Sequence, residues 1–158
     1  MSDPVTIPVW RRIDAQITSS GQPGEEQLQE IRALGVEHVV NLALHTHEQA
    51  LPDEAKSVAA LGMAYTHIPV AFDAPTEEDF QAFCKAMVAI GDAPTHVHCI
   101  VNARVSAFLY RWRRDVLGLD EGRIRGDLEA IWRPGGVWAA FIGDEGSVDL
   151  PHRPPAAS

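Results

Sequence analysis

A cysteine, an arginine and a serine lie close together in residues 98–106, which read His-Cys-Ile-Val-Asn-Ala-Arg-Val-Ser. Cys99 ends an apolar run typical of a buried strand, and a helical pattern begins a few residues later. The thiol would therefore lie beside a helix N-terminus, where free N–H groups and the helix dipole stabilise a thiolate. Arg104 adds a planar cation that suits a tetrahedral oxyanion, and Ser106 can donate its hydroxyl to the sulfur. These are the groups that thiolate attack on a phosphoester requires.

The backbone of this loop is the second part of the expected site. A strand that turns tightly into a helix directs several N–H groups toward one point, where they can hold the oxygens of an anion. The phosphate-binding residues predicted in this way are Ile100, Val101, Asn102, Ala103, Arg104 and Val105.

Apolar patterning places the loop within an alternating series of strands and helices. Strands are predicted over residues 12–18, 36–44, 63–70 and 95–99, and helices over 25–34, 52–61, 75–90, 105–117 and 121–132. Thr76 is the predicted N-cap of the third helix. The alternation predicts a three-layer α/β/α fold around a central, mainly parallel sheet of four or five strands. Ligands bind such sheets at the carboxyl ends of the strands, so we expect the site among loops 19–24, 44–52, 70–76 and 99–104.

The charge balance argues against two classes of partner. The 158 residues include 13 Lys or Arg and 22 Asp or Glu, for a formal net charge of −9. A nucleic-acid partner and an anionic membrane surface both require the opposite excess, so neither is expected. We therefore interpret Arg111, Arg113 and Arg114 as the solvent-facing side of a helix.

Cysteine usage and the terminal segments predict the compartment and the domain organisation. The two cysteines, Cys84 and Cys99, form no Cys-x-x-Cys pair, so neither a structural zinc site nor a disulfide scaffold is expected. Cys84 follows the apolar face of the third helix and is expected in the core. Without a signal-peptide pattern or a membrane-spanning run, the expectation is a cytoplasmic protein. One domain is predicted over residues 1–150, with a disordered Pro- and Ala-rich tail over 151–158.

Motifs spread along the chain resemble those of the cysteine-dependent, dual-specificity-like protein phosphatases. The loop of these enzymes reads His-Cys-x-x-Gly-x-x-Arg-Ser/Thr, and a bacterial phosphatase-like subgroup has His-Cys-x-x-Asn-x-Arg-Val-Ser, as residues 98–106 do. Further motifs of that subgroup are Ser-Gly-Gln-Pro (20–23), Asn-Leu (41–42), Ile-Pro-Val (68–70), Pro-Thr-Glu-Glu-Asp (75–79), Ile-Trp-x-Pro (131–134) and Trp-x-x-Phe (138–141). The resemblance implies a phosphotyrosine-phosphatase-like fold, no cofactor, and a phosphorylated small molecule or protein as substrate.

The loop departs from the common phosphatase pattern in its spacing. Four residues separate Cys99 from Arg104, whereas the common loop has five. On a helix, one residue corresponds to a rotation of about 100°. Arg104 can then face the anion only if the loop is shorter or wound differently. Asn102 falls on the usual Gly position, and Asn tolerates a left-handed backbone better than most residues.

The resemblance also implies roles for residues outside the loop. The general acid of these enzymes is an Asp in the loop after the third strand, and Asp73 is the only carboxylate within residues 70–75. A solvated turn residue is the alternative interpretation of Asp73. His98 is expected to orient the loop through hydrogen bonds, and Gln22 either contacts substrate or stabilises a turn.

A metal site formed by histidines is an alternative that the sequence does not favour. His96 and His98 point to the same side of a strand but lack an obvious third ligand there. His45, His47 and Glu48 are interpreted as a pocket rim or a solvated loop. No metal is therefore expected.

Three functions remain in contention at this point. The leading one is hydrolysis of phosphomonoesters through a cysteinyl-phosphate intermediate. The second is a rhodanese-like sulfurtransferase with a persulfide on Cys99, because many rhodaneses also have four residues between Cys and Arg. The third is a pseudophosphatase that binds phosphate without turnover.

Overall fold

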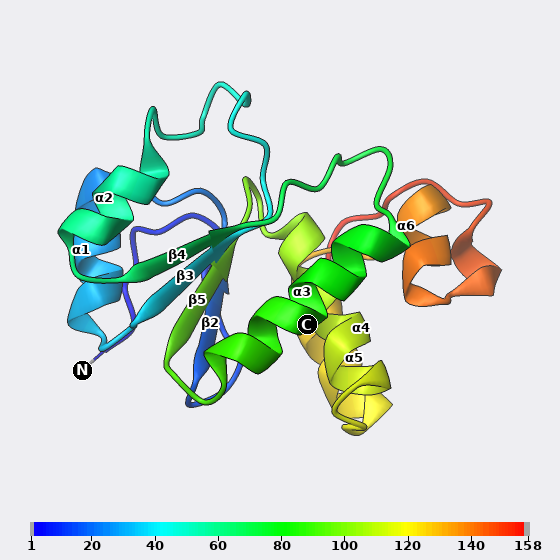
Figure 1. The fold of residues 1–158 in the computed structure, drawn as a ribbon. Coiled ribbons are helices and arrows are strands. Elements are labelled where there is room, and N and C mark those ends of the chain that lie inside the picture. The colour runs from blue at the N-terminus through cyan, green and yellow to red at the C-terminus, as the bar shows by residue number, and fades with distance from the viewer. Residues whose placement is uncertain (1, 157–158) are drawn as a thin grey trace.

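The computed structural model describes residues 2–156, which form a five-stranded sheet flanked by helices (Figure 1). The strand order is β1-β2-β5-β3-β4, and the bounds are Arg11–Arg12 (β1), Ile17–Ser20 (β2), His38–Asn41 (β3), Ala64–His67 (β4) and Thr95–His98 (β5). β1 pairs antiparallel with β2, and all other pairs are parallel. This confirms the predicted α/β class with a mainly parallel central sheet.

Helices cover both faces of the sheet, as Figure 1 shows. One layer contains α1 (Glu25–Ala33) and α2 (Glu54–Ala60); the other contains α3 (Glu77–Ile90), α4 (Ala103–Asp115) and α5 (Glu121–Glu129). Each layer has its own apolar core, one around Leu28, Ile31 and Val39 and a larger one around Phe83, Phe108 and Leu109. Strand β3 serves both cores, because Val39 packs into the smaller one and Val40 into the larger one, as the burial of a parallel sheet on both faces requires.

The central strand β5 determines where the site lies. All four of its residues are buried, with Val97 in the larger core and His96 stacked on Trp10 on the opposite face. His98 is level with Ser20 of β2 on one side and Asn41 of β3 on the other. The loops that follow these three strands therefore meet at one edge of the sheet.

The predicted first strand, 12–18, was wrong in its bounds. The structure has two short antiparallel strands, β1 and β2, with a turn between them. The Asp14 carboxylate accepts hydrogen bonds from the amides of Gln16 and Ile17 and stabilises that turn. Asp is favoured in turns for this reason, and the prediction overlooked it.

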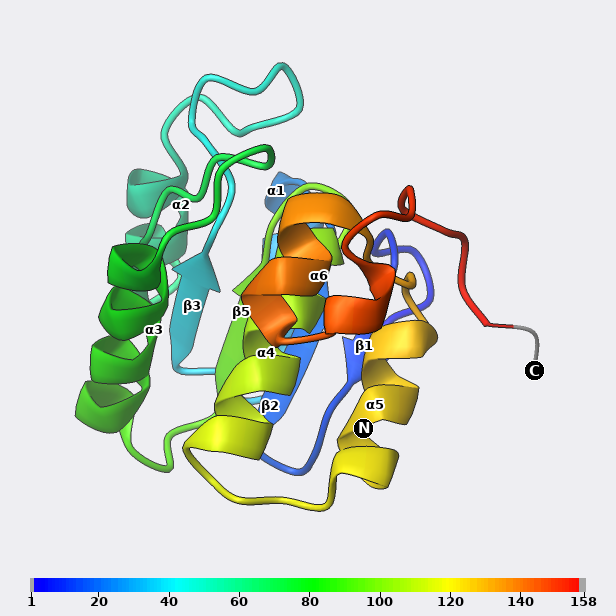
Figure 2. The same ribbon diagram turned by 90° about the vertical axis from the view of Figure 1, so that its right-hand side faces the viewer.

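The C-terminal part contains elements that the sequence patterns did not indicate. A helix α6 (Gly136–Ile142) and a 3-10 turn (Glu145–Ser147) follow α5, and Figure 2 shows them beside α4 and α5. Residues 151–156 were expected to be disordered, but Arg153 exchanges two backbone hydrogen bonds with Arg133, and the Ala156 amide donates to the Glu129 carbonyl. Residues 157–158 of the predicted tail lie outside the described residues.

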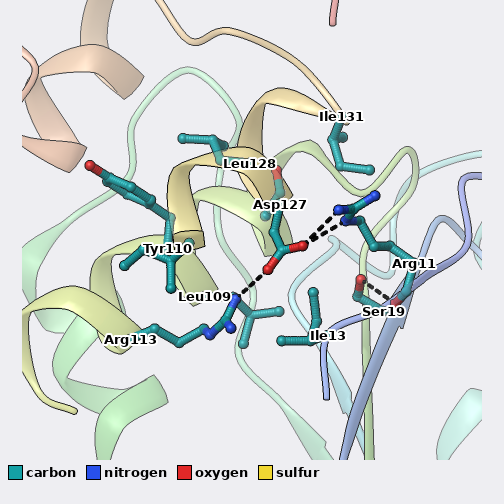
Figure 3. Close-up of a pocket in the computed structure, with 11 residues that line it drawn as sticks. Arg11, Ile13, Ser19, Leu109, Tyr110, Arg113, Asp127, Leu128 and Ile131 are labelled. Carbon is teal, nitrogen blue, oxygen red and sulfur yellow. Dashed lines mark hydrogen bonds and ion pairs between the residues drawn. The ribbon is translucent and has the colours of Figure 1, made fainter. Parts of the chain in front are cut away.

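An ion-pair cluster joins β1, α4 and α5 (Figure 3). The Asp127 carboxylate pairs with Arg11 and Arg113, both at 2.7 Å, beside a cavity of about 10 Å³. Arg113 is only 3% exposed, so the prediction that it lies on the solvent-facing side of its helix was wrong. A buried arginine requires a partner, and Asp127 of α5 supplies it from a distant part of the sequence.

No helix of the described residues has the length and apolarity needed to span a membrane.

Candidate functional site

The loop between β5 and α4 is a compact turn. β5 ends at His98 and α4 begins at Ala103, two residues earlier than predicted. Asn102 is the N-cap of α4 and has left-handed backbone angles, φ 67° and ψ 5°. Asn102 thus adopts the left-handed conformation that Asn tolerates well, and this conformation lets the chain reverse direction directly after β5.

Hydrogen bonds turn the carbonyl groups of this loop away from its inner side. The Cys99 carbonyl lies 3.1 Å from His98 Nδ1, and the Ile100 carbonyl accepts a hydrogen bond from the Gln22 amide at 3.0 Å. In a trans peptide the N–H points opposite to the C=O, so the amides of Ile100 and Val101 point the other way. The N–H groups of residues 100–105 donate to no oxygen of residues 2–156. Consecutive free N–H groups of this kind form an anion-binding concavity.

Two segments far away in the sequence hold the loop in this shape. Asn102 Nδ2 donates to the Val9 carbonyl (3.0 Å) and to Ser19 Oγ (3.1 Å). Gly21 lies so close that a Cβ there would be 2.4 Å from the Ile100 carbonyl oxygen. Val9 itself has φ 49°, and it and Asn102 are the non-glycine residues with positive φ in the described chain. The sequence contained no signal for the role of Val9, because the contact depends on the folded chain alone.

Cys99 lies beneath the loop in the larger core. Its side chain has no exposed surface, and it does not line the neighbouring cleft. That cleft has a volume of about 430 Å³ and is lined by Leu44, Thr46, His47, Phe72, Ile100, Val101 and Arg104. The structure therefore brings Arg104 and two loop residues to the cleft and leaves the thiol covered.

Arg104 lies at the edge of this cleft despite the unusual spacing. Its Nη1 donates to the Val70 carbonyl at 2.8 Å, and its guanidinium carbon lies 5.9 Å from the centre of the Phe72 ring. Its other N–H groups meet no acceptor among the residues that the structure describes. A guanidinium with donors to spare beside free backbone amides is suited to a tetrahedral oxyanion.

Ser106 differs from its expected role. Its hydroxyl donates to the Ala103 carbonyl at 2.9 Å and accepts a hydrogen bond from Trp132 Nε1, also at 2.9 Å. Serines within helices commonly bond back to the preceding turn in this way, so the hydroxyl does not donate to the sulfur as predicted. Ser106 instead links the start of α4 to Trp132, which follows α5.

Asp73, the predicted general acid, lies in the exposed turn after β4. Its carboxylate makes no hydrogen bond to the described residues. The preceding residue, Phe72, lines the cleft, and its carbonyl accepts a hydrogen bond from Trp138 Nε1 at 2.5 Å. Asp73 therefore lies next to a residue that lines the cleft and is held by Trp138.

His98 contacts a residue that the sequence analysis did not single out, Glu54. Nε2 of His98 lies 2.5 Å from Glu54 Oε2, and Gln22 Nε2 donates to Glu54 Oε1 at 3.0 Å. Burial by itself raises the pKa of Glu54, but hydrogen bonds and the charge of His98 outweigh burial and bring this pKa below its usual value. Glu54 begins α2 and resembles an ordinary acidic residue of a first helical turn, so only the fold reveals its position.

The remaining histidines are engaged in contacts of their own. His96 lies between the hydroxyls of Thr18 and Ser20, each 2.8 Å away, and burial lowers its pKa well below the usual value. His45 stacks on His67 with ring centres 3.7 Å apart, and His47 lines the cleft, as a pocket-rim residue would. Within residues 2–156 no group of three or more His, Cys, Asp or Glu side chains is arranged to hold a metal ion.

A protein-family model described as "DSP-PTPase phosphatase fused to NAD+ Kinase" matches residues 10–125. The chain belongs to this phosphatase family. The matched residues of this phosphatase domain run from β1 to α5 and include the Cys99 loop.

The chain is also similar to curated proteins and to solved structures. The phosphatase domain is 35% identical over 124 residues to a beta-lactamase hydrolase-like protein of Agrobacterium fabrum, a match that covers 75% of this chain and 27% of that protein. The chain thus spans about a quarter of the length of the curated relatives it matches. The crystal structure of a Shewanella putrefaciens protein described as "Putative phosphatase (DUF442)" has a TM-score of 0.77 and 31% identity, with 88% of this chain and 91% of that chain covered.

More distant structures share the fold. Pseudomonas aeruginosa TpbA in complex with pTyr has a TM-score of 0.62 and 16% identity, and the match covers 77% of this chain and 72% of that one. The catalytic domain of the PP-IP phosphatase SIW14 from S. cerevisiae has a TM-score of 0.69 and 14% identity, with 89% and 87% covered.

Proposed function

We propose that this phosphatase domain hydrolyses phosphomonoesters through a cysteinyl-phosphate on Cys99. The thiolate attacks phosphorus, the bond from phosphorus to the leaving oxygen breaks, and Asp73 gives its proton to that oxygen. Water then attacks the phosphorus with Asp73 as base, which releases inorganic phosphate and regenerates the thiolate. Neither a metal nor a cofactor takes part in these steps.

One observation carries this proposal: the Cys99–Ile100 turn holds its carbonyls outward, and the N–H groups of residues 100–105 find no acceptor among the described residues. Such a run of free donors next to a cysteine and an arginine has a use if an oxyanion occupies it. Preorganised donors of this kind stabilise the charge that develops on phosphoryl oxygens.

Reaction requires the loop to open around the anion, because the Cys99 side chain is covered in this structure. Arg104 then exchanges its hydrogen bond with the Val70 carbonyl for bonds to a phosphoryl oxygen. The exchange replaces a neutral acceptor by an anionic one, so that attraction between opposite charges adds to the hydrogen bond.

The cleft beside Arg104 indicates the kind of leaving group. Its walls include Leu44, Phe72, Ile100 and Val101, and Arg104 is its only Lys or Arg. We therefore expect a substrate with one phosphoryl group on an apolar small molecule or side chain. TpbA, a structural neighbour, binds such a group, pTyr.

The test compares the wild type with Cys99→Ser and with a matched control, Cys84→Ser, on 4-nitrophenyl phosphate. Loss of the nucleophile should lower kcat by about three orders of magnitude or more. Cys84 is partly buried against the same core and lies outside the loop, so its variant should keep the wild-type rate. Equal rates for wild type and Cys99→Ser would refute the proposal.

Two further measurements identify the alternatives. Intact mass after incubation with thiosulfate reveals a persulfide on Cys99 if the protein is a sulfurtransferase. Calorimetry with inorganic phosphate, combined with a rate that does not depend on Cys99, would indicate a phosphate binder without turnover. Either result would replace the hydrolase mechanism.

A further inference from the structure

The buried carboxylate of Glu54 lies at the meeting point of the loops that form the site. Glu54 is 2% exposed, although it begins a helix whose next residues face solvent. An ionised carboxylate in such a place is costly unless it is paired and hydrogen-bonded. Its position therefore calls for an explanation beyond helix formation.

The partners of Glu54 are the two residues that orient the phosphate loop. Oε2 faces His98, whose Nδ1 contacts the Cys99 carbonyl; Oε1 accepts from the side chain of Gln22, whose backbone amide binds the Ile100 carbonyl. One carboxylate thus fixes both groups that turn successive loop carbonyls outward.

The two hydrogen-bond partners of His98 favour one arrangement of its protons. A backbone carbonyl only accepts hydrogen bonds, so Nδ1 of His98 carries a proton. An ionised Glu54 also only accepts, so Nε2 of His98 must carry a proton as well. A His98 that donates to both partners carries a positive charge one residue from the Cys99 thiol, and this is the state that the inference below assigns to it.

We propose that Glu54 is a positioning residue for the reaction at Cys99: it keeps His98 doubly protonated, and His98 in turn fixes the Cys99 carbonyl and stabilises the thiolate. This inference rests on the function proposed above. It assigns Glu54 no contact with substrate and no part in proton transfer.

Other titratable groups lie near Glu54 and His98, and their effects on pH dependence must be distinguished from those of this pair. His96 on β5 lies beside His98 with ring centres 6.2 Å apart, and it is enclosed by two hydroxyls. From β4 come His67, which hydrogen-bonds the Ala43 carbonyl, and Tyr65, whose pKa burial raises to about 12. His45 of the β3–α2 loop is exposed, and Asp53 caps α2 in solvent.

The variant Glu54→Gln separates charge from shape. The new amide can accept from Gln22 and donate to Nε2 of a neutral His98, so the contact with the Cys99 carbonyl is retained. We expect kcat on 4-nitrophenyl phosphate to fall about tenfold or more and the acid limb of the pH–rate profile to move to higher pH, since one pKa unit is about tenfold in thiolate. KM should change less than about threefold, because the binding amides stay in place.

Two further variants keep this result interpretable. Glu26→Gln makes the same charge change in the first turn of α1, where Glu26 is exposed, and should leave rate and profile unchanged. The double variant Glu54→Gln/His98→Gln removes both charges and therefore leaves no unpaired buried ion. If Glu54 acts through His98, the double variant is no slower than His98→Gln alone.

A measurement without turnover distinguishes this inference from the proposed function. In ¹⁵N-histidine NMR spectra, assigned with His98→Gln, wild-type His98 should be an imidazolium at neutral pH and should become neutral in Glu54→Gln. A neutral His98 in the wild type, or an unshifted pH–rate profile in Glu54→Gln, would overturn the role of Glu54 and leave the phosphatase mechanism intact. Equal activity of wild type and Cys99→Ser would remove the mechanism, while the NMR result would still decide the state of His98.

Discussion

Single residues determine the chemistry of this site through the partner that each polar atom has. Asn102, His98 and Gln22 use their hydrogen bonds to hold the loop, whereas the amides of residues 100–105 donate to no acceptor within residues 2–156. Arg104 is intermediate, because one of its donors is bound to the Val70 carbonyl. The free donors are thus those directed at the place where an anion would bind.

The proposed role of Asp73 gives a prediction that depends on the leaving group. In Asp73→Asn, kcat should fall by about 100-fold for an alkyl phosphate, because an alkoxide needs a proton to leave. The loss should be much smaller for 4-nitrophenyl phosphate, whose phenolate leaves unaided. Steady-state rates for the two substrates check this prediction.

The control for Asp73→Asn is Glu48→Gln, a charge change in another exposed loop at the same edge of the sheet. It should affect neither substrate. An equal loss on both substrates in Asp73→Asn would show that Asp73 is a solvated turn residue with an indirect effect.

At this scale the sequence predicted the residues whose partners are close in the chain. Cys99, Arg104 and Asn102 belong to one short motif, and their types alone suggest the chemistry. Glu54 and Val9 were missed because their contacts with His98 and Asn102 join distant segments. Ser106 was assigned the wrong acceptor, because the Ala103 carbonyl was not considered as a competitor of the sulfur.

Among the secondary-structure elements, the β5–α4 turn depends on the turn that follows β2. Gly21 in that turn leaves no room for a Cβ beside the Ile100 carbonyl, and its own amide donates to the Pro8 carbonyl at 2.8 Å. A side chain at position 21 would have to displace loop backbone. The close approach therefore explains the glycine without any requirement for positive φ.

Gly21→Ala should consequently disturb the loop more than the sheet. We expect it to destabilise the fold by about 1–3 kcal/mol, as overpacking does, and to lower kcat/KM by about 100-fold because the loop amides are displaced. Denaturant unfolding and steady-state kinetics measure the two effects. Gly24→Ala is the matched control, since its Cβ would meet only the Gln27 side chain, at 3.8 Å. If both variants kept wild-type kcat/KM, the turn at Gly21 would have no part in shaping the site.

Elements with strong local signals were predicted best. The predicted N-cap of α3, Thr76, was confirmed, and Thr76 and Asp79 exchange hydrogen bonds in a capping box. The β1–β2 turn and α6 were missed, because a turn within an apolar run and a seven-residue helix have weak periodicity. The packing of α6 depends on partners such as Phe108, which its own sequence does not reveal.

For the whole molecule, histidines buried in neutral form link stability to pH. Burial, together with the charge of His98, lowers the pKa of His96 well below 6.5, and burial also lowers the pKa of His38 and His67. The unfolded chain therefore binds protons that the folded chain does not. The contribution of these histidines to the free energy of unfolding is fully present above about pH 6.5. It decreases as the pH falls below that value toward the folded-state pKa values.

The free energy of unfolding should thus decrease on acidification, with His96 contributing up to about 1.4 kcal/mol per pH unit. Urea unfolding at several values between about pH 5 and 8 measures this slope. His96→Gln, which can still bond to the hydroxyls of Thr18 and Ser20, should have a shallower slope, whereas the exposed His47→Gln should match the wild type. A wild-type slope in His96→Gln would contradict the assignment.

The contact between Val9 and Asn102 has a practical consequence for any shortened form of this protein. A chain starting at residue 10 would retain every strand and helix, because β1 begins at Arg11. It would nevertheless lack the carbonyls that anchor Asn102 and Gly21. Circular dichroism would report normal secondary structure for such a truncated chain, although its anion-binding loop had lost two anchoring hydrogen bonds. Residues 8 and 9 therefore belong to the shortest segment that can hold this loop in place.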